Sequence, residues 1–266
     1  MPSRAGWLSL ILLCVSAPAL ADAEGDALGE RVASRRANEG RVGIMHFRLV
    51  NSGGKVRERE ALMAHSDRDD AVRIAIYFTG PAVIRDTAFL SHDYRVREDE
   101  NWLYLPATER VRRLPVSDRG DYFMGTDLTY GDIKDDFKFG LDDWRFSHGG
   151  FREEGGQTYE VLLGEVATPK IARELGYSAF EAWIDPESAF PRVTRFADPE
   201  GAPLKVVTVE AVERIGGAWT ALAFSVDQLQ TGHRTEVSFE NMRHVPDLST
   251  AVFEAQRLSF GVPVIP

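Results

Sequence analysis

A long series of short segments, in which apolar and polar residues alternate, most constrains how this 266-residue chain can fold. Residues 70–80 show the pattern most clearly, because Val72, Ile74, Ile76 and Phe78 share one side of a strand and mostly smaller or polar residues share the other. Further strand candidates follow the same reasoning: 41–51, 55–64, 87–93, 101–105, 110–114, 157–166, 179–184, 192–197, 204–215, 219–230 and 234–243.

The turns between these candidates determine how the strands pair. Four short connections, each containing Gly, join two candidates apiece: residues 51–54, 198–201, 216–217 and 231–232. Only antiparallel neighbours permit such short connections, so the sequence predicts an antiparallel meander. A sheet this wide curls or closes, and its concave face is then either filled by side chains or covered by helices and loops that leave a ligand cavity.

Short helical segments interrupt the strands. Residues 22–38 have helical periodicity, and residues 168–176 have Thr168 as N-cap, Pro169 in the first turn and Gly176 as the stop. Residues 246–258 predict another short helix with Phe253 and Leu258 facing inward. We therefore expect an α+β fold, a strongly curved antiparallel half-barrel with short helices covering its concave face.

Residues 1–21 have the pattern of a secretory signal peptide: Arg4, an apolar run over 7–15, and small residues before a cleavage site after Ala21. The apolar run is shorter than the roughly 20 residues of a membrane-spanning helix. Cys14 follows Leu13, where a lipoprotein signal would need a small residue. We expect an exported, periplasmic protein in which residues 22–266 form one domain without disulfides.

The charge of the remaining chain argues against nucleic-acid binding. Removal of residues 1–21 takes away one cation and no anion, which leaves 30 cations against 41 anions and a formal charge of −11. An acidic protein of this kind gains little from general electrostatic attraction to nucleic acids or anionic membranes.

Residues 120–137 combine loop-forming Gly, Asp and Thr with large apolar side chains. Phe123, Met124, Leu128 and Tyr130 would not be expected in an ordinary solvated loop. Two interpretations remain open: the segment is a lid over a ligand cavity, or it is an anchor packed into a filled core.

Residues 101–133 contain Trp-Leu-Tyr-Leu-Pro, Arg-Arg-Leu, Phe-Met-Gly-Thr-Asp and Tyr-x-Asp, and residues 180–206 contain a later strand pair. Together they resemble the LolA-like outer-membrane lipoprotein-sorting proteins, although Thr126 stands where that pattern has Ser. The resemblance implies a half-barrel whose hydrophobic cavity holds acyl chains across the periplasm. It also implies two partners, an inner-membrane transporter of the resistance-nodulation-division (RND) type and an outer-membrane acceptor. The expected cavity and lid residues are Val72, Ile74, Ile76, Phe78, Trp102, Tyr104, Phe123, Met124, Leu128 and Tyr130.

Arg110 and Arg112 lie on one face of a strand candidate near the expected mouth of this cavity. Guanidinium groups bind phosphate through paired donors, so these two residues are candidates for contact with a lipid headgroup. Ion pairs with the abundant acidic residues are the alternative.

Other chemistry has weaker support. The six histidines are too far apart in sequence for a local metal site, and the acids between Asp132 and Asp143 lack the spacing of a calcium loop. No nucleophile motif or cofactor motif is present. The sequence favours a carrier of lipid or lipoprotein acyl chains rather than an enzyme. A lipid-sensing module of envelope stress signalling, or a hydrolase whose carboxylates the fold brings together, remain alternatives.

Overall fold

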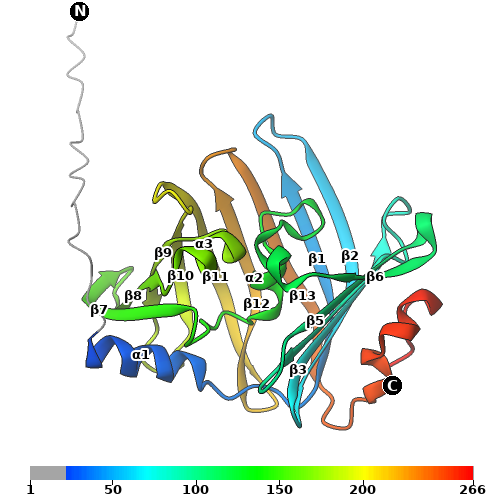
Figure 1. Ribbon diagram of the computed structural model, residues 1–266, viewed down its shortest axis with the longest axis horizontal. Helices are drawn as coiled ribbons and strands as arrows, with labels where there is room; N and C mark the ends of the chain where they lie inside the picture. Colours follow the sequence, from blue (N-terminus) through cyan, green and yellow to red (C-terminus); the bar gives the residue numbers. More distant parts are fainter. Residues whose placement is uncertain (1–21, 266) are drawn as a thin grey trace, which may run out of the picture.

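The computed structural model describes residues 22–265, so the predicted leader and its cleavage site lie outside the described residues. One antiparallel sheet of thirteen strands dominates this part of the chain (Figure 1). Its strands are β1 (Arg41–Val50), β2 (Val56–Arg68), β3 (Ala71–Gly80), β4 (Ala88–Tyr94), β5 (Glu100–Leu105), β6 (Arg110–Leu114), β7 (Trp144–Glu154), β8 (Gln157–Val166), β9 (Ala179–Ile184), β10 (Pro191–Ala197), β11 (Pro203–Ile215), β12 (Ala218–Gln228) and β13 (His233–His244).

The order of the strands divides the sheet into two meanders that share its centre. Strands β1 to β6 run outward from the centre to one edge, and β7 to β13 run from the other edge back to the centre, where β13 pairs with β1. Residues 115–143, which we call the crossover segment, connect edge strand β6 to edge strand β7. The crossover segment must therefore pass across the sheet, and Figure 1 shows its helix α2 (Tyr130–Lys134) in front of the central strands.

The predicted fold class is confirmed: the sheet is open, curved and antiparallel, with few short helices. The four short turns join β1 to β2, β10 to β11, β11 to β12 and β12 to β13, all antiparallel. Strand β7 was not predicted from the sequence. This strand contains Gly149 and Gly150, and its register with β8 shifts between His148 and Phe151, so it lacks the regular alternation that identified the other strands.

Helices cover both faces of the sheet. Helix α1 (Ala23–Ala33) starts after Asp22, whose carboxylate accepts a hydrogen bond from the Gly25 amide, and it packs on β7 and β8. Helix α3 (Pro169–Leu175) has the predicted Thr168 cap and ends at Gly176, where φ is +79°. The sheet lies between these helices and the C-terminal residues.

The C-terminal residues form two short 3₁₀ helices, η4 (Thr250–Phe253) and η5 (Ala255–Phe260), where the sequence predicted one short helix. Phe253 and Leu258 do face inward and are buried. They pack with Tyr77, whose hydroxyl donates to the Val252 carbonyl oxygen at 2.9 Å, on the convex face of the sheet. Within residues 22–265, no helix is both long and apolar enough to span a bilayer.

Candidate functional site

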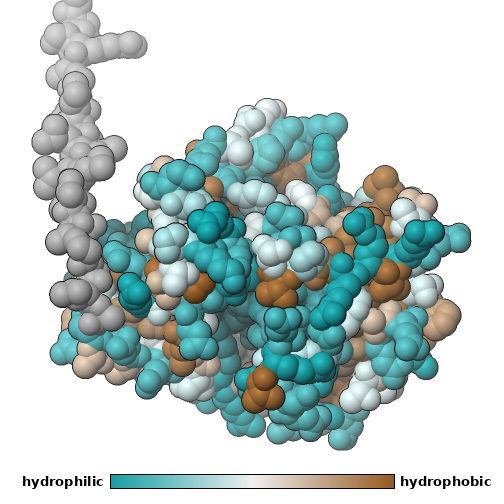
Figure 2. All heavy atoms as spheres, in the orientation of Figure 1, coloured by the Kyte–Doolittle hydropathy of each residue, from teal (hydrophilic) through white to brown (hydrophobic). Residues whose placement is uncertain are grey.

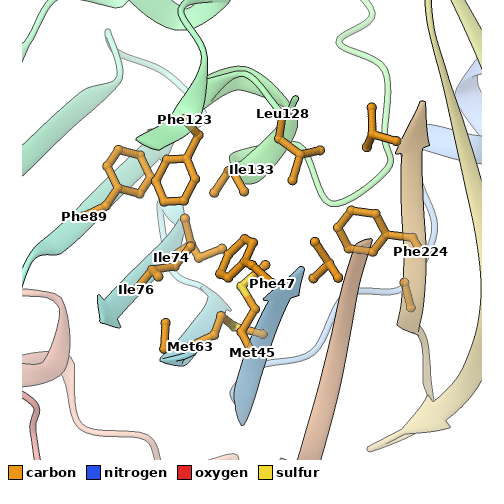
Figure 3. Close-up of a cluster of buried hydrophobic side chains, with 14 of the residues drawn as sticks. Met45, Phe47, Met63, Ile74, Ile76, Phe89, Phe123, Leu128, Ile133 and Phe224 are labelled. Atoms are coloured by element: carbon orange, nitrogen blue, oxygen red, sulfur yellow. The ribbon is translucent and has the colours of Figure 1, made fainter. Parts of the chain in front are cut away.

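The crossover segment places apolar side chains on the concave face of the sheet. Phe123 lies in the short 3₁₀ helix η3 (Phe123–Gly125) and is fully buried (Figure 3). Its ring centroid lies 6.1 Å from that of Phe78, 5.4 Å from that of Phe89 and 5.5 Å from that of Tyr130. Such aromatic contacts hold the crossover segment to strands β3 and β4.

A left-handed turn aims this part of the segment at the sheet. Met124 has a φ of +49° and Gly125 a φ of +74°, and the Thr126 hydroxyl donates to the Phe123 carbonyl oxygen at 2.7 Å. Met124 is only partly buried, and its carbonyl oxygen accepts a hydrogen bond from Arg59. The turn therefore buries Phe123 completely while Met124 remains at the rim.

Buried polar contacts anchor the crossover segment to strand β11. Lys205 is fully buried, and its Nζ lies 2.5 Å from Asp132 Oδ2 and 3.0 Å from the Asp127 carbonyl oxygen. Asp132 also accepts hydrogen bonds from the Tyr177 hydroxyl at 3.0 Å and from the Thr129 amide at 2.7 Å, where it completes the N-terminal cap of α2.

A second contact joins the segment to β13 at the centre of the sheet. The Thr235 hydroxyl donates to Asp127 Oδ2 at 2.7 Å and accepts from the Asp127 amide at 3.0 Å. Burial raises the pKa of Asp127, an effect that the hydrogen bond from Thr235 opposes. These groups are buried and satisfied, so the segment has one well-defined resting position on the sheet.

An interior cavity of about 100 Å³ lies between α2 and the concave face. Its walls are mainly apolar, and they include Met45, Met63, Ile74, Phe224 and Phe239 from the sheet. This cavity is smaller than the engineered apolar cavity of about 150 Å³ that accepts benzene. It is also smaller than the about 300–1,000 Å³ of typical ligand pockets, so an acyl chain requires movement of the side chains that fill this space.

One end of the cavity is polar. Arg41 at the start of β1 is buried and holds Asp136 with two hydrogen bonds, of 2.7 Å and 3.2 Å. Burial raises the pKa of Asp136, but the charges of Arg41 and its neighbours outweigh burial and lower this pKa to about 2. His65, directly opposite Arg41 on β2, is also buried, and burial together with the charge of Arg41 lowers its pKa to about 3. His65 is therefore neutral at physiological pH.

The predicted cavity residues fall into distinct positions. Ile74, Ile76 and Phe78 belong to the apolar cluster beneath the crossover segment, and of these Ile74 lines the cavity. Val72, on the same strand, is half-buried and lines a separate outer recess. Within the crossover segment, Phe123 and Leu128 are buried in the cluster, whereas Met124 and Tyr130 pack against it.

The prediction for Trp102 and Tyr104 is wrong. Both belong to the cluster on the convex face, where they pack with the C-terminal residues. Leu103, the residue between them, faces the concave cluster. Successive side chains of a strand point to opposite faces, and the C-terminal cover allows the outer face of β5 to be as apolar as its inner face.

Arg110 and Arg112 are exposed on edge strand β6, and neither forms an ion pair within the part of the chain that the structure describes. Their cross-strand partners are Leu105 and Leu103, so both arginines are on the concave side of the sheet edge. A contact between these arginines and a headgroup stays a prediction.

The buried polar residues of the site were not predicted from the sequence. Arg41, His65 and Lys205 are buried in strands where a polar residue ordinarily indicates the solvent side, and no local pattern marks Arg41 or His65 as buried. Lys205 interrupts an apolar run, and this interruption was the one available signal.

The surface in front of this site is mainly hydrophilic, with scattered apolar patches (Figure 2). Three carboxylates line the cavity wall: Asp132 contacts Lys205, Tyr177 and Thr129, Asp136 contacts Arg41, and Asp135 lies 3.9 Å from Lys134. The arrangement is thus an apolar cavity with a charged end, closed by a segment that several contacts hold to the sheet.

Comparison with known proteins agrees with this architecture. A solved domain from Vibrio parahaemolyticus, described as belonging to an outer membrane lipoprotein-sorting protein, is 25% identical with a TM-score of 0.80, over 89% of this chain and 98% of that chain. A DUF1329 family protein from Desulfovibrio piger is 24% identical with a TM-score of 0.80, over 88% and 98%. A LolA superfamily protein from Nitrosomonas europaea is 17% identical with a TM-score of 0.64, over 89% and 98%.

None of the curated proteins matches this chain. A family model described as "Uncharacterized protein" matches residues 70–259, which is more than half of the sequence. The chain therefore belongs to the family that this model describes. It has the fold of the LolA-like outer-membrane lipoprotein-sorting proteins, which are its structural neighbours.

Proposed function

We propose that this protein is a periplasmic carrier that binds the acyl portion of a lipid or lipoprotein and moves it between the inner and outer membranes. The observation that carries the proposal is the continuous apolar concave face, which has a cavity and is closed by one connecting segment. The lipoprotein-sorting description of a similar structure supports the same class of cargo.

Loading requires the crossover segment to shift, because the interior cavity of about 100 Å³ cannot hold an acyl chain in the described state. Several hundred Å² of lipid apolar surface, at roughly 25 cal/mol per Å², offers on the order of ten kcal/mol before losses. Met45 and Met63 in the cavity wall are flexible side chains that can repack around a cargo chain. Cargo binding can therefore offset the contacts that are lost when the segment moves.

The proposed route has two membrane partners, an inner-membrane RND-type transporter that loads the carrier and an outer-membrane acceptor that unloads it. The exposed arginines Arg110 and Arg112 at the sheet edge are candidates for contact with headgroups during transfer. In this proposal the crossover segment is the lid, and Phe123 is the residue that seats it when the cavity is closed.

A covalent lock tests whether the segment must move. The side chains of Asp127 and Thr235 touch, so Asp127→Cys/Thr235→Cys places two thiols at the junction of the segment and β13. Residues 22–266 contain no other cysteine, which makes the pair selective. Transfer of a fluorescent phospholipid between donor and acceptor vesicles is then measured for the same variant in oxidised and reduced form, with disulfide formation checked by thiol counting.

We expect the reduced form to accelerate transfer and the oxidised form to lose most of that acceleration. Equal transfer by the two forms would show that the segment is a fixed anchor rather than a lid. If the wild-type protein binds the lipid but does not accelerate transfer, the carrier proposal fails and a sensing role becomes the better account. The reduced form is the matched control, because both forms carry the same two substitutions.

A further inference from the structure

Three buried polar atoms without a partner among the described residues belong to two residues that line the charged end of the cavity and to one arginine beside it. They are Arg35 Nη1, Arg41 Nε and His65 Nδ1. Arg41 and His65 are more than nine-tenths buried, stand directly opposite each other on β1 and β2, and both line the cavity. Buried polar atoms are nearly always satisfied in folded proteins, so a cluster of three unpartnered atoms indicates a binding position.

Positive charge is in excess at this position. Arg35, Arg41 and Lys138 lie near the Asp136 carboxylate, which Arg41 already holds, and the next acid near Lys138 is Asp67. Arg35 Nη2 donates to the carbonyl oxygens of Asp136 and Phe137, at 2.8 Å and 3.0 Å. Lys138 Nζ donates to the Arg35 carbonyl oxygen at 3.0 Å. Neither Arg35 nor Lys138 forms an ion pair within residues 22–265.

The other acids near this corner face other cations, and one of these, Lys134, is shared by Asp93, Asp99 and Asp135. Asp135, which also lines the cavity, lies 3.9 Å from Lys134, and Asp67 is paired with Arg95. Burial lowers the pKa of Arg35 to about 10 and also lowers that of Lys138, while His65 stays neutral. Burying cations without enough counter-charge is costly, and an anionic ligand would relieve that cost.

The position of the cluster suits a ligand with a polar head and an apolar tail. His65, Asp136 and Lys138 line both the interior cavity and an outer recess of about 210 Å³. The interior side continues into the apolar wall formed by Met45, Met63 and neighbouring residues. A head bound at this wall therefore has an apolar interior on one side and a more open recess on the other.

We propose that Arg41, His65, Arg35 and Lys138 bind the anionic group of a single-chain amphiphile, a carboxylate or a phosphate monoester, whose acyl chain enters the cavity. This deepens the proposed function and rests on it. Arginine nitrogens bind such oxygens through strong charge-assisted hydrogen bonds, and neutral His65 contributes one more donor when Nδ1 carries its proton. The head would thus lie inside the protein, away from the exposed arginines of β6.

Three twelve-carbon probes that differ only in the head test this site by calorimetry: dodecanoate and dodecyl phosphate, each below its critical micelle concentration, and dodecanol, below its solubility limit. We expect the wild-type protein to bind at least one of the two anions tenfold or more tightly than the alcohol. Preference for dodecanoate indicates a fatty acid as cargo, and preference for dodecyl phosphate indicates a phosphate-bearing lipid. Equal affinity for all three probes overturns the head site but leaves the carrier proposal standing, whereas binding of none overturns both.

Substitutions at the proposed head site show which residues cause the preference for an anionic head. Arg41→Gln/Asp136→Asn removes the central cation together with its counter-charge, so the net charge is unchanged, and Asn suits the positive φ of +49° at position 136. We expect this variant to lose the tenfold anion preference while its affinity for dodecanol stays within twofold. Lys138→Met, which leaves the Arg41 pair intact, should lose part of the preference, and this second variant keeps the test decisive if the first does not fold.

The matched control is Arg48→Gln, which removes an exposed arginine paired with Glu236 on another part of the sheet and should keep the full preference. A fourth variant, Arg110→Gln/Arg112→Gln, tests the sheet edge. If the anion preference disappears in that variant and persists in Arg41→Gln/Asp136→Asn, the head binds at β6 and the proposal is overturned.

Discussion

Replacement of Lys205 by Met should show how strongly the crossover segment is held to the sheet. Lys205 is fully buried, so the substitution leaves the Asp132 carboxylate without its cation at 2.5 Å and the Asp127 carbonyl oxygen without its donor at 3.0 Å. Breaking a buried ion pair from one side typically costs about 3–5 kcal/mol. Asp132 keeps the Thr129 amide and the Tyr177 hydroxyl, which places the expected loss near about 3 kcal/mol.

Met is a suitable replacement because the Lys205 ammonium lies 4.9 Å from the ring centre of Tyr177 and 5.6 Å from that of Phe196. A thioether packs well near aromatic rings, so the change tests the charge rather than the volume. For a chain of this size, about 3 kcal/mol corresponds to a fall in Tm of about 6–12 °C. Urea denaturation followed by tryptophan fluorescence, with calorimetric Tm values, measures both quantities.

Two further variants make this result interpretable. Lys170→Met removes an exposed lysine that is paired with Glu174 at 3.4 Å, and it should cost less than about 0.5 kcal/mol. Lys205→Met/Asp132→Asn should recover part of the loss, because Asn removes the unpaired charge while its side-chain oxygen can still cap α2. If Lys205→Met loses less than about 1 kcal/mol, or no more than Lys170→Met, the ion pair does not anchor the segment.

Two more predictions concern pH and packing. The pKa of His65 falls to about 3 on folding, so between pH 6.5 and 3 the unfolded chain takes up a proton that the folded chain does not, and stability decreases as the pH falls. His65→Gln should remove about 1.4 kcal/mol per pH unit of this loss in urea titrations between pH 6 and pH 4, and an unchanged slope would contradict the assignment. Gly25→Ala, although it favours a helix, would place a Cβ 2.3 Å from Ser147 Cα, so we expect a net loss of about 1–3 kcal/mol from displacement of α1. A higher Tm for Gly25→Ala would show that α1 can move away from β7 at little cost.

The sequence predicted much of the sheet because turn chemistry and strand alternation are local properties. Thr168, Pro169 and Gly176 marked the ends of α3 correctly, since caps depend on neighbouring residues only. Strand β7 escaped because its Gly149-Gly150 bulge interrupts the alternation. The C-terminal residues form two short 3₁₀ helices rather than one helix, and they bury Phe253 and Leu258 as predicted.

The candidate site was harder to predict because its polar half depends on contacts between distant parts of the chain. Lys205 and Asp132 are 73 residues apart, and Arg41 and Asp136 are 95 residues apart. Apart from the apolar residues that flank Lys205, nothing local distinguishes these residues from solvent-exposed strand and loop residues. Trp102 and Tyr104 were assigned to the wrong face for the same reason, since only the C-terminal cover makes the outer face of β5 apolar.

The pairing of β1 with β13 has a consequence for how the chain reaches its native state. The contacts between these strands join residues such as Arg41 and His244, whereas every other strand pair joins sequence neighbours. A chain delivered N-terminus first can complete the meander from β1 to β6 early, but the outer edge of β1 then stays unpaired until the last strand arrives. Such long-range pairing is slow, and an unpaired edge favours association with other chains. We therefore expect newly made protein to be most prone to aggregation before β13 is available, and truncation before His233 to leave an aggregating product rather than a smaller folded one.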